Sequence, residues 1–138
     1  MKLTYIAFFS FCFIGCFAWF DSESDTIIGK YNVTWIDLPS SRSIDISNKT
    51  GQGGGAQIIP PYIFGVGHNK NFIIAKQHPV NGNKVNTLQT NYYIIDIRNE
   101  NYNREEIYGP FSKAQFDSSL IKLHVGLIEF NMSYPDNP

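Results

Sequence analysis

Lys76 is the polar residue whose position is best suited to chemistry. It lies within Phe72–His78, a run whose β-branched and aromatic residues predict a buried strand. Burial of an ammonium group without a partner is costly, so we expect a carboxylate beside it. Asp96 on the next predicted strand, or Asp37, could form a buried or functional polar pair with Lys76. The more ordinary alternative is a lysine at the margin of a sheet, whose charged end reaches water.

The three histidines do not form a metal-binding pattern. In the hairpin that the sequence predicts, His68 and His78 lie at opposite ends of the paired strands, about 20 Å apart. His124 lies near the expected end of a helix, where a histidine commonly contacts terminal carbonyls. The spacing matches no set of zinc ligands, so we expect no metal.

The remaining motifs indicate no catalytic site. Gly51–Gly55 lacks the Lys-Ser/Thr ending of a phosphate-binding loop, and no serine sits in a Gly-x-Ser-x-Gly turn. We therefore expect no cofactor and no enzymatic activity. An enzyme that uses Lys76 or His78 together with a carboxylate is the weakest of three functional hypotheses.

The N-terminal segment has the residues of an export signal. Lys2 supplies a positive charge, and the apolar stretch Leu3–Gly15 leads directly to Cys16. Phe13–Cys16 resembles the lipobox of bacterial lipoproteins, in which the cysteine is lipidated and becomes the first residue of the mature chain. This resemblance implies that residues 1–15 are a signal peptide and that Cys16 carries the lipid.

Two alternatives to lipidation remain open. Residues 16–20 continue the apolar run, which covers 18 residues from Leu3 to Phe20, the lower limit for crossing a bilayer core of about 30 Å. An uncleaved anchor or an ordinary cleaved signal would therefore also fit. The only cysteines, Cys12 and Cys16, both lie in this segment, so the folded domain has no disulfide.

The rest of the chain has the composition of one folded domain. Of its 138 residues, 43% are hydrophobic and 15% are aromatic, which is enough to form a core. The formal net charge is −1 and the basic residues do not gather in runs, so we expect no nucleic-acid partner. The polar residues 21–26 predict a linker, residues 27–130 a single domain and residues 131–138 a frayed tail.

Outside the hairpin, five stretches have the composition of strands. The first, Tyr31–Asp37, carries Tyr31, Val33 and Trp35 on one face. The second, Ser43–Ser47, alternates polar and apolar residues, as a strand near an edge of the sheet would. After Tyr31–Asp37, the predicted strands outside the hairpin are Ser43–Ser47, Asn91–Ile97, and two short ones at residues 105–108 and 127–130.

The clearest predicted element is a β-hairpin that joins Tyr62–His68 to Phe72–His78 through a three-residue loop. In the register that we expect, the facing pairs are His68 with Phe72, Val66 with Ile74, Phe64 with Lys76 and Tyr62 with His78. Gly65 and Gly67 then share the other face with Ala75. Small residues on that face predict close packing of a second layer over it.

A helix start is marked by Ser112, which fits an N-cap, with Gln115 three residues later to complete a capping box. Phe111 and Phe116 can close a hydrophobic staple across this start. The helix should run for about three turns and end near residues 124–126. The order of elements predicts an α+β fold, in which an antiparallel sheet of about five strands is covered by one C-terminal amphipathic helix.

Phe64–Pro79, and Tyr92–Asp96 followed by Tyr108–Phe111, resemble a family of small, uncharacterised bacterial lipoproteins that carry domain of unknown function 3997. The resemblance covers most of the chain after Cys16. It implies export and lipidation, and it supplies no activity and no catalytic residues.

The leading hypothesis is an exported, lipid-anchored, non-enzymatic domain of the cell envelope with a binding or structural role. Such a domain would be held at the membrane by its lipid or apolar anchor, where an envelope protein could be its partner. The alternative is an immunity- or inhibitor-type protein that neutralises a toxin or hydrolase at the membrane.

Overall fold

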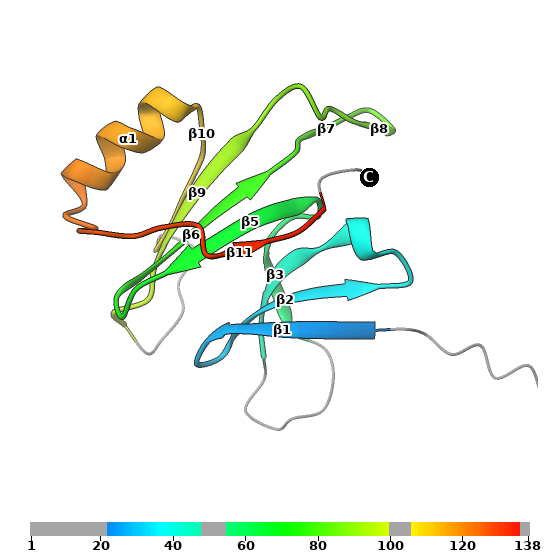
Figure 1. The fold of residues 1–138 in the computed structure, drawn as a ribbon, viewed down its shortest axis with the longest axis horizontal. Coiled ribbons are helices and arrows are strands. Elements are labelled where there is room, and N and C mark those ends of the chain that lie inside the picture. Colours follow the sequence, from blue (N-terminus) through cyan, green and yellow to red (C-terminus); the bar gives the residue numbers. More distant parts are fainter. Residues whose placement is uncertain (1–21, 48–54, 100–105, 136–138) are drawn as a thin grey trace, which may run out of the picture.

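The chain folds into two antiparallel sheets and one α-helix, which is an α+β arrangement (Figure 1). The computed structural model describes residues 22–47, 55–99 and 106–135. One sheet has four strands in the order β1-β2-β3-β4, and the other has five in the order β10-β9-β6-β5-β11. The sequence predicted the helix and a sheet of about five strands but not a second sheet.

The four-stranded sheet is built from the first half of the chain. Its strands are β1 (Ser22–Ile28), β2 (Tyr31–Ile36), β3 (Ser43–Ile46) and β4 (Ala56–Ile59), with the short 3-10 helix η1 (Pro39–Ser41) between β2 and β3. The predicted strands that begin at Tyr31 and Ser43 are confirmed. β3 lies next to the edge strand β4, which agrees with the position near an edge that the sequence predicted.

The segment expected to be a linker belongs to this sheet. Residues 22–26 pair with β2 as part of β1, so the fold includes at least these residues before Ile27. Their polarity misled the prediction because β1 is an edge strand, where polar side chains stay in water. Of β1, only Ile27 is fully buried among the side chains that the structure describes.

The five-stranded sheet is built from the second half. Its strands are β5 (Ile63–His68), β6 (Phe72–Gln77), β9 (Asn91–Asp96), β10 (Ile107–Phe111) and β11 (Met132–Ser133), and β7 (Val80–Asn81) with β8 (Lys84–Val85) forms a separate small ribbon. The predicted strand at residues 91–97 is confirmed. Residues 127–130 form no strand, and the expected frayed tail contributes β11, which pairs with β5.

The β5–β6 hairpin is confirmed, but its register at the loop differs by one residue from the predicted one. His68 pairs with Ile73, because the side chain of Asn69 accepts hydrogen bonds from the backbone N–H groups of Asn71 and Phe72 and tightens the loop. A bulge at Phe64 then absorbs the extra residue.

Beyond the bulge the predicted register returns. The backbone N–H of His78 donates to the carbonyl of Tyr62, so these two residues face each other as predicted. Between the loop and the bulge, each side chain of β5 therefore lies on the opposite face of the sheet from the predicted one. Val66 therefore shares a face with Ala75, and the glycines lie on the opposite face.

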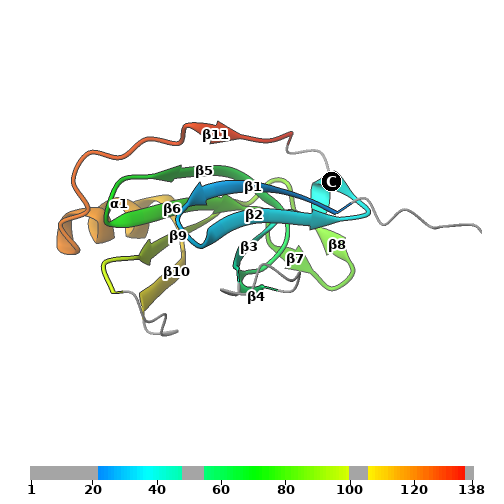
Figure 2. The same cartoon turned by 90° about the horizontal axis from the view of Figure 1, so that it is seen from below.

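The five-stranded sheet is the middle of three layers (Figure 2). Its face toward the four-stranded sheet carries Ile73 and Ile95, which pack with Val33 and Ile44 in the main core. Its other face carries Ile74 and the rest of a second core under the helix. Because both faces are covered, β6 and β9 are apolar on both sides.

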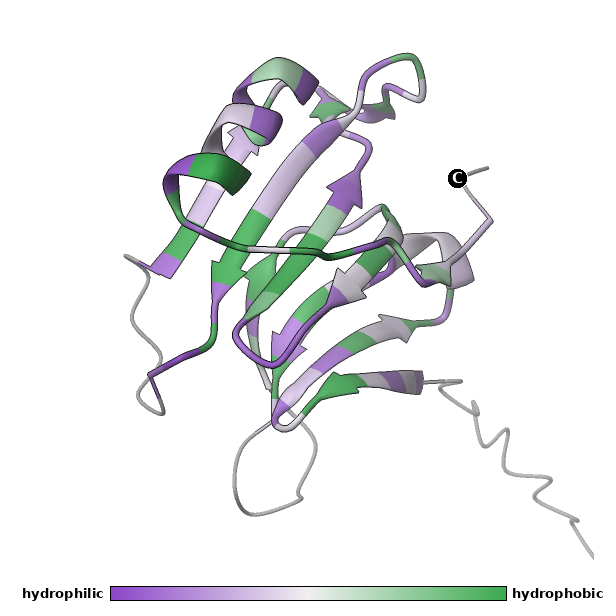
Figure 3. Cartoon of the chain, turned by 60° about the vertical axis from the view of Figure 1, so that its left-hand side comes forward, coloured by the Kyte–Doolittle hydropathy of each residue, from purple (hydrophilic) through white to green (hydrophobic). Residues whose placement is uncertain are grey.

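The helix α1 (Lys113–Lys122) covers the second face of the middle sheet. The predicted capping box is present: the N–H of Gln115 donates to the Ser112 hydroxyl, and the Gln115 side chain accepts from the N–H of Ser112. Hydrophobic and hydrophilic residues alternate along α1 in Figure 3. Its one fully buried side chain, Phe116, anchors it to the sheet.

After α1 the chain crosses back over the glycines of β5. A Cβ atom added to Gly67 would lie 1.9 Å from the carbonyl oxygen of Glu129, so only glycine fits beneath this crossing. Close packing over a glycine face is therefore confirmed. The covering element is an extended segment, and Ala75 is on the other side of the sheet.

Candidate functional site

The structure does not bring Lys76 and Asp96 together, so the predicted pair is wrong. Both side chains belong to the face of the middle sheet that α1 covers. Lys76 is opposite Tyr92, whereas Asp96 is opposite Phe72 at the other end of the same two strands. Four residues along a strand correspond to about 13 Å. The sequence placed the two residues on neighbouring strands but could not give the position along them.

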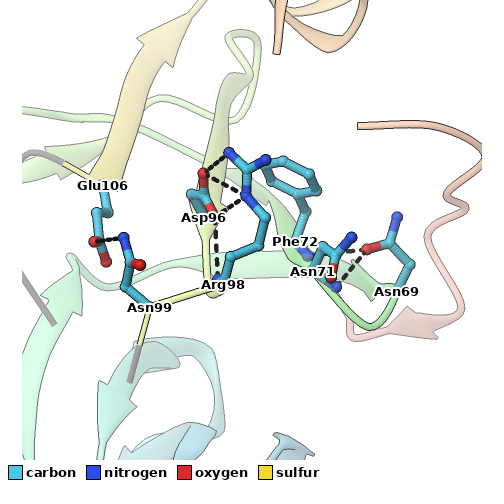
Figure 4. A network of polar contacts seen from close by, with 7 residues as sticks. All are labelled: Asn69, Asn71, Phe72, Asp96, Arg98, Asn99 and Glu106. Atoms are coloured by element: carbon cyan, nitrogen blue, oxygen red, sulfur yellow. Dashed lines mark hydrogen bonds and ion pairs between the residues drawn. The ribbon is translucent and has the colours of Figure 1, made fainter. Parts of the chain in front are cut away.

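Asp96 is instead held by Arg98, two residues later (Figure 4). The Nε atom of Arg98 donates to both carboxylate oxygens, at 2.9 and 3.1 Å, and the backbone N–H of Arg98 donates to Oδ1. The guanidinium also lies over the ring of Phe72, with its carbon 5.0 Å from the ring centroid. This arrangement neutralises a buried carboxylate at the end of β9.

The hydrogen bonds from Arg98 hold the pKa of Asp96 below its ordinary value of 3.8, even though burial acts in the opposite direction. The carboxylate therefore stays ionised at neutral pH, and its oxygens are occupied by the donors of Arg98. A general acid or base needs a pKa near the working pH. Asp96 therefore has a structural role at the end of β9. At the nearby loop of the β5–β6 hairpin, the side-chain amide of Asn69 donates to the carbonyl of Val125.

Lys76 has an aromatic partner in place of a carboxylate. Its Nζ lies 4.2 Å from the centroid of the Phe130 ring, a cation–π contact. Its methylene chain packs over Gly65, since a Cβ added there would lie 3.3 Å from the Lys76 Cδ. Lys76 is half-buried, so the contact fixes the C-terminal segment on the sheet while the ammonium keeps access to water.

The histidines are separated, as the sequence predicted. His68 ends β5 at the loop, and His78 follows β6 at the opposite end. The ring of His78 stacks on Phe64 with centroids 4.2 Å apart, and its Nδ1 is 3.0 Å from the carbonyl oxygen of Gln89. Among the residues in ranges 22–47, 55–99 and 106–135, no three His, Cys, Asp or Glu side chains form a group that could hold a metal ion.

The most unusual polar group is one that sequence reasoning missed. Arg42 is 7% exposed, and its guanidinium carbon lies 5.1 Å from the ring of Trp35 and 4.6 Å from the ring of Tyr134. The two rings contact each other edge to face, and the Tyr134 hydroxyl donates to Asp25 at 3.0 Å. We call these four residues the Arg42 cluster.

The Arg42 cluster joins segments that are far apart in sequence. Asp25 and Trp35 come from β1 and β2, Arg42 follows η1, and Tyr134 follows β11. In the described part of the chain, the Nε of Arg42 is buried and has no hydrogen-bond partner. A guanidinium between two rings can recognise an anionic or carbonyl group, because its N–H donors are fixed in direction.

The same groups are poorly suited to proton transfer. Burial, with the hydrogen bond to Asp25 as the second cause, raises the pKa of Tyr134, so its hydroxyl stays protonated. Arginine is always protonated in proteins. Arg42 and Tyr134 therefore do not exchange protons at neutral pH.

No local signal in the sequence pointed to the cluster. Arg42 follows a turn that the sequence marked as a loop, and Tyr134 lies in the residues expected to form a tail. The one indication was the residue types, because tryptophan, tyrosine and arginine are enriched among the residues that contribute most to binding at protein interfaces.

The other predicted site residue, Cys16, lies outside the residues that the structure describes, as do Gly51–Gly54. Within the described ranges no helix is long and apolar enough to cross a membrane.

The fold and the cluster define a three-layer α+β domain with an arginine held between aromatic rings. Residues 28–134 match the family described as "Protein of unknown function (DUF3997)", and the chain belongs to this family. The match begins at Ile28, the last residue of β1, and includes every described element from β2 to β11 and the Arg42 cluster except Asp25. No curated protein and no solved structure matches the chain.

Proposed function

We propose that this chain is an exported, membrane-tethered and non-enzymatic binding domain of the cell envelope. The observation that carries the proposal is the position of Cys16 relative to the folded domain. Only five residues lie between Cys16 and Ser22, where β1 begins. The two residues are six positions apart, and six positions of extended chain span at most about 22 Å. A lipid on Cys16 would hold the domain directly against the membrane surface.

The N-terminal sequence supports a lipid anchor. The positive charge of Lys2, the apolar stretch Leu3–Gly15 and the following Cys16 have the order found in lipoprotein signals. Each buried methylene of an acyl chain contributes about 0.8 kcal/mol, and two acyl chains are enough for stable attachment. Diacylation of one cysteine would therefore be a sufficient anchor.

The roles of the polar side chains favour binding over catalysis. Asp96 is neutralised by Arg98, and Lys76 lies over Phe130. In the Arg42 cluster, the guanidinium of Arg42 and the hydroxyl of Tyr134 keep their protons at neutral pH, since the pKa of Tyr134 is raised and arginine is always protonated. A guanidinium that keeps its charge and is oriented by two aromatic rings is better suited to recognition of a partner than to proton transfer.

The direct test compares Cys16→Ser with Cys12→Ser, which changes the other cysteine of the same apolar segment. We expect mass spectrometry of the membrane fraction to find the wild type and Cys12→Ser cleaved before residue 16 and acylated on it. Cys16→Ser should carry no acyl mass. An intact Met1 together with an unmodified Cys16 in the wild type would show that lipidation is wrong and would leave the uncleaved anchor.

The binding role is tested separately by crosslinking in the envelope fraction. We expect Arg42→Gln to lose partners that the wild type recovers, with Lys113→Gln as a control at an exposed lysine on α1. Recovery of a toxin or hydrolase would favour the inhibitor alternative. Recovery of cytoplasmic proteins alone would contradict an envelope function.

A further inference from the structure

The turn that follows β2 presents two large aliphatic side chains to the solvent. Ile36 is 60% exposed and Leu38 is 63% exposed. The backbone N–H of Leu38 donates to the carbonyl of Ile36 at 2.7 Å across Asp37, whose φ of 62° is in the left-handed region. This γ-turn leaves one residue, Asp37, between the two exposed side chains. We call Ile36, Asp37 and Leu38 the apolar tip.

The apolar tip is held in place by its neighbours. The hydroxyl of Ser41 donates to the carbonyl of Leu38 at 2.7 Å, and its backbone N–H donates to the same oxygen at 2.9 Å. Pro39 begins the 3-10 helix that returns the chain to the sheet. Exposed aliphatic side chains on a fixed turn lose little conformational freedom when they are buried by a partner.

The tip lies at the end of the domain from which the chain runs back to Cys16. Ser22, the first residue of β1, pairs with Ile36. Figures 1 and 2 show the arrowhead of β2 beside the start of β1. Because at most about 22 Å of chain separates Ser22 from Cys16, an anchor at Cys16 keeps this end of the domain close to the bilayer.

Other exposed hydrophobic residues come from the same end. The β7–β8 ribbon lies toward the same end of the long axis but apart from the start of β1 in Figure 1; it contains Val80, which is 48% exposed, and Leu88, which follows the ribbon in the chain, is 98% exposed. The remaining large exposed hydrophobics of the described ranges, Ile121 and Leu127, lie at the end of α1 or beyond it, on the opposite side. Ile36 and Leu38 are therefore the two large exposed hydrophobic residues that lie beside the start of β1.

The groups behind the tip suit the interface between lipid and water. Trp35 directly precedes it, and Tyr134 contacts Trp35. Tryptophan and tyrosine are enriched at membrane surfaces because their rings are apolar and their ends are polar. Asp37 at the tip and Glu23 beside it are exposed acidic residues. An acidic surface gains nothing from anionic lipids, so the contact must depend on apolar area.

We propose that the apolar tip contacts the membrane to which the chain is tethered, with Ile36 and Leu38 in the interfacial region of the bilayer. This inference rests on the proposed tether. It deepens the proposal by giving the domain a fixed orientation, in which α1 points away from the membrane. The Arg42 cluster then lies at the membrane side of the domain.

The test measures tryptophan contact with brominated lipid. Trp19→Phe leaves Trp35 as the only tryptophan of the full chain, and this background is combined with Leu38→Trp or with the matched control Leu127→Trp. Each protein, purified with its native lipid, is reconstituted into phosphatidylcholine vesicles with or without bromine on the acyl chains. We expect bromine to cause a loss of the fluorescence added at residue 38 and no loss of that added at residue 127.

A second variant tests the role of the tip itself. In the Trp19→Phe background, Ile36→Ser together with Leu38→Ser should reduce the quenching of Trp35, while the protein still floats with the vesicles. Equal quenching at residues 38 and 127, in protein that floats, would overturn the inference and leave the tether intact. Protein that does not float with the vesicles would overturn both the tether and the inference.

Discussion

Replacement of Gly67 by alanine tests how closely the C-terminal segment crosses the middle sheet. The added Cβ would lie 1.9 Å from the Glu129 carbonyl oxygen and 2.7 Å from its carbon. Unbonded heavy atoms have their optimum near 3.5 Å, so the segment would have to move by about 1.5 Å. Because the obstructing atoms belong to the backbone, no side-chain rotation relieves the contact.

The expected cost follows from overpacking and is reduced by a backbone effect. Insertion of a methyl group into a closely packed site costs about 1–3 kcal/mol. Glycine to alanine, where the backbone allows it, returns about 0.4–1 kcal/mol by restricting the unfolded chain. We expect Gly67→Ala to lower the free energy of unfolding by about 1–2 kcal/mol, the difference between these two effects.

The matched control is Gly65→Ala, two residues earlier on the same strand. Its Cβ would lie 3.3 Å from the Cδ of Lys76, near the end of a flexible side chain that can move aside. We expect this variant to unfold within about 0.5 kcal/mol of the wild type.

Urea unfolding followed by circular dichroism measures both variants. Hydrogen exchange at Met132 and Ser133, which pair with β5, reports whether the crossing segment has left the sheet. We expect faster exchange there in Gly67→Ala only. Equal stabilities for the two alanine variants, with unchanged exchange, would refute the close crossing of Glu129 over β5.

Three further predictions concern the charge of Asp96 and the packing and capping of α1. Folding lowers the pKa of Asp96, so the ionised carboxylate stabilises the fold above the ordinary pKa of 3.8, and this stabilisation is lost as the pH falls below that value. The urea midpoint of Asp96→Asn should therefore be lower than that of the wild type at pH 7, and the two midpoints should converge in acid. A gap that widens in acid would contradict this. Phe116→Ala should cost about 3–5 kcal/mol in thermal or urea unfolding, because Phe116 is the one fully buried side chain of α1, and a loss below that of an exposed alanine substitution would show that α1 does not pack as described. Ser112→Ala should cost about 1 kcal/mol by loss of the capping box, whereas Ser118→Ala on the exposed face of α1 should cost less.

Local patterns in the sequence predicted most individual elements. The capping box at Ser112 and Gln115 depends on residues three apart, so it can be read without knowledge of the rest of the fold. The faces of β2 followed from alternation: Tyr31 and Val33 are buried in the main core, and Trp35 packs against it. The separation of His68 and His78 followed from the hairpin, in spite of the one-residue difference in register.

Elements that depend on distant partners could not be predicted. β1 is polar and becomes a strand because β2 supplies its hydrogen-bonding partner. β11 is two residues long and exists only because β5 lies beside it. The register of the hairpin depends on the side chain of Asn69. This side chain accepts hydrogen bonds from the N–H groups of Asn71 and Phe72 and makes the loop tighter than the predicted three-residue loop.

By itself, the sequence determined the class of fold, the helix with its cap and the apolar N-terminal segment that contains Cys16. These features arise from neighbouring residues, and neighbouring residues interact whatever the rest of the chain does. Only the tertiary structure separated Lys76 from Asp96 and joined Arg42 to Trp35 and Tyr134. Such contacts depend on strand register and on sheet packing, and a shift of one residue moves a side chain to the other face of its sheet.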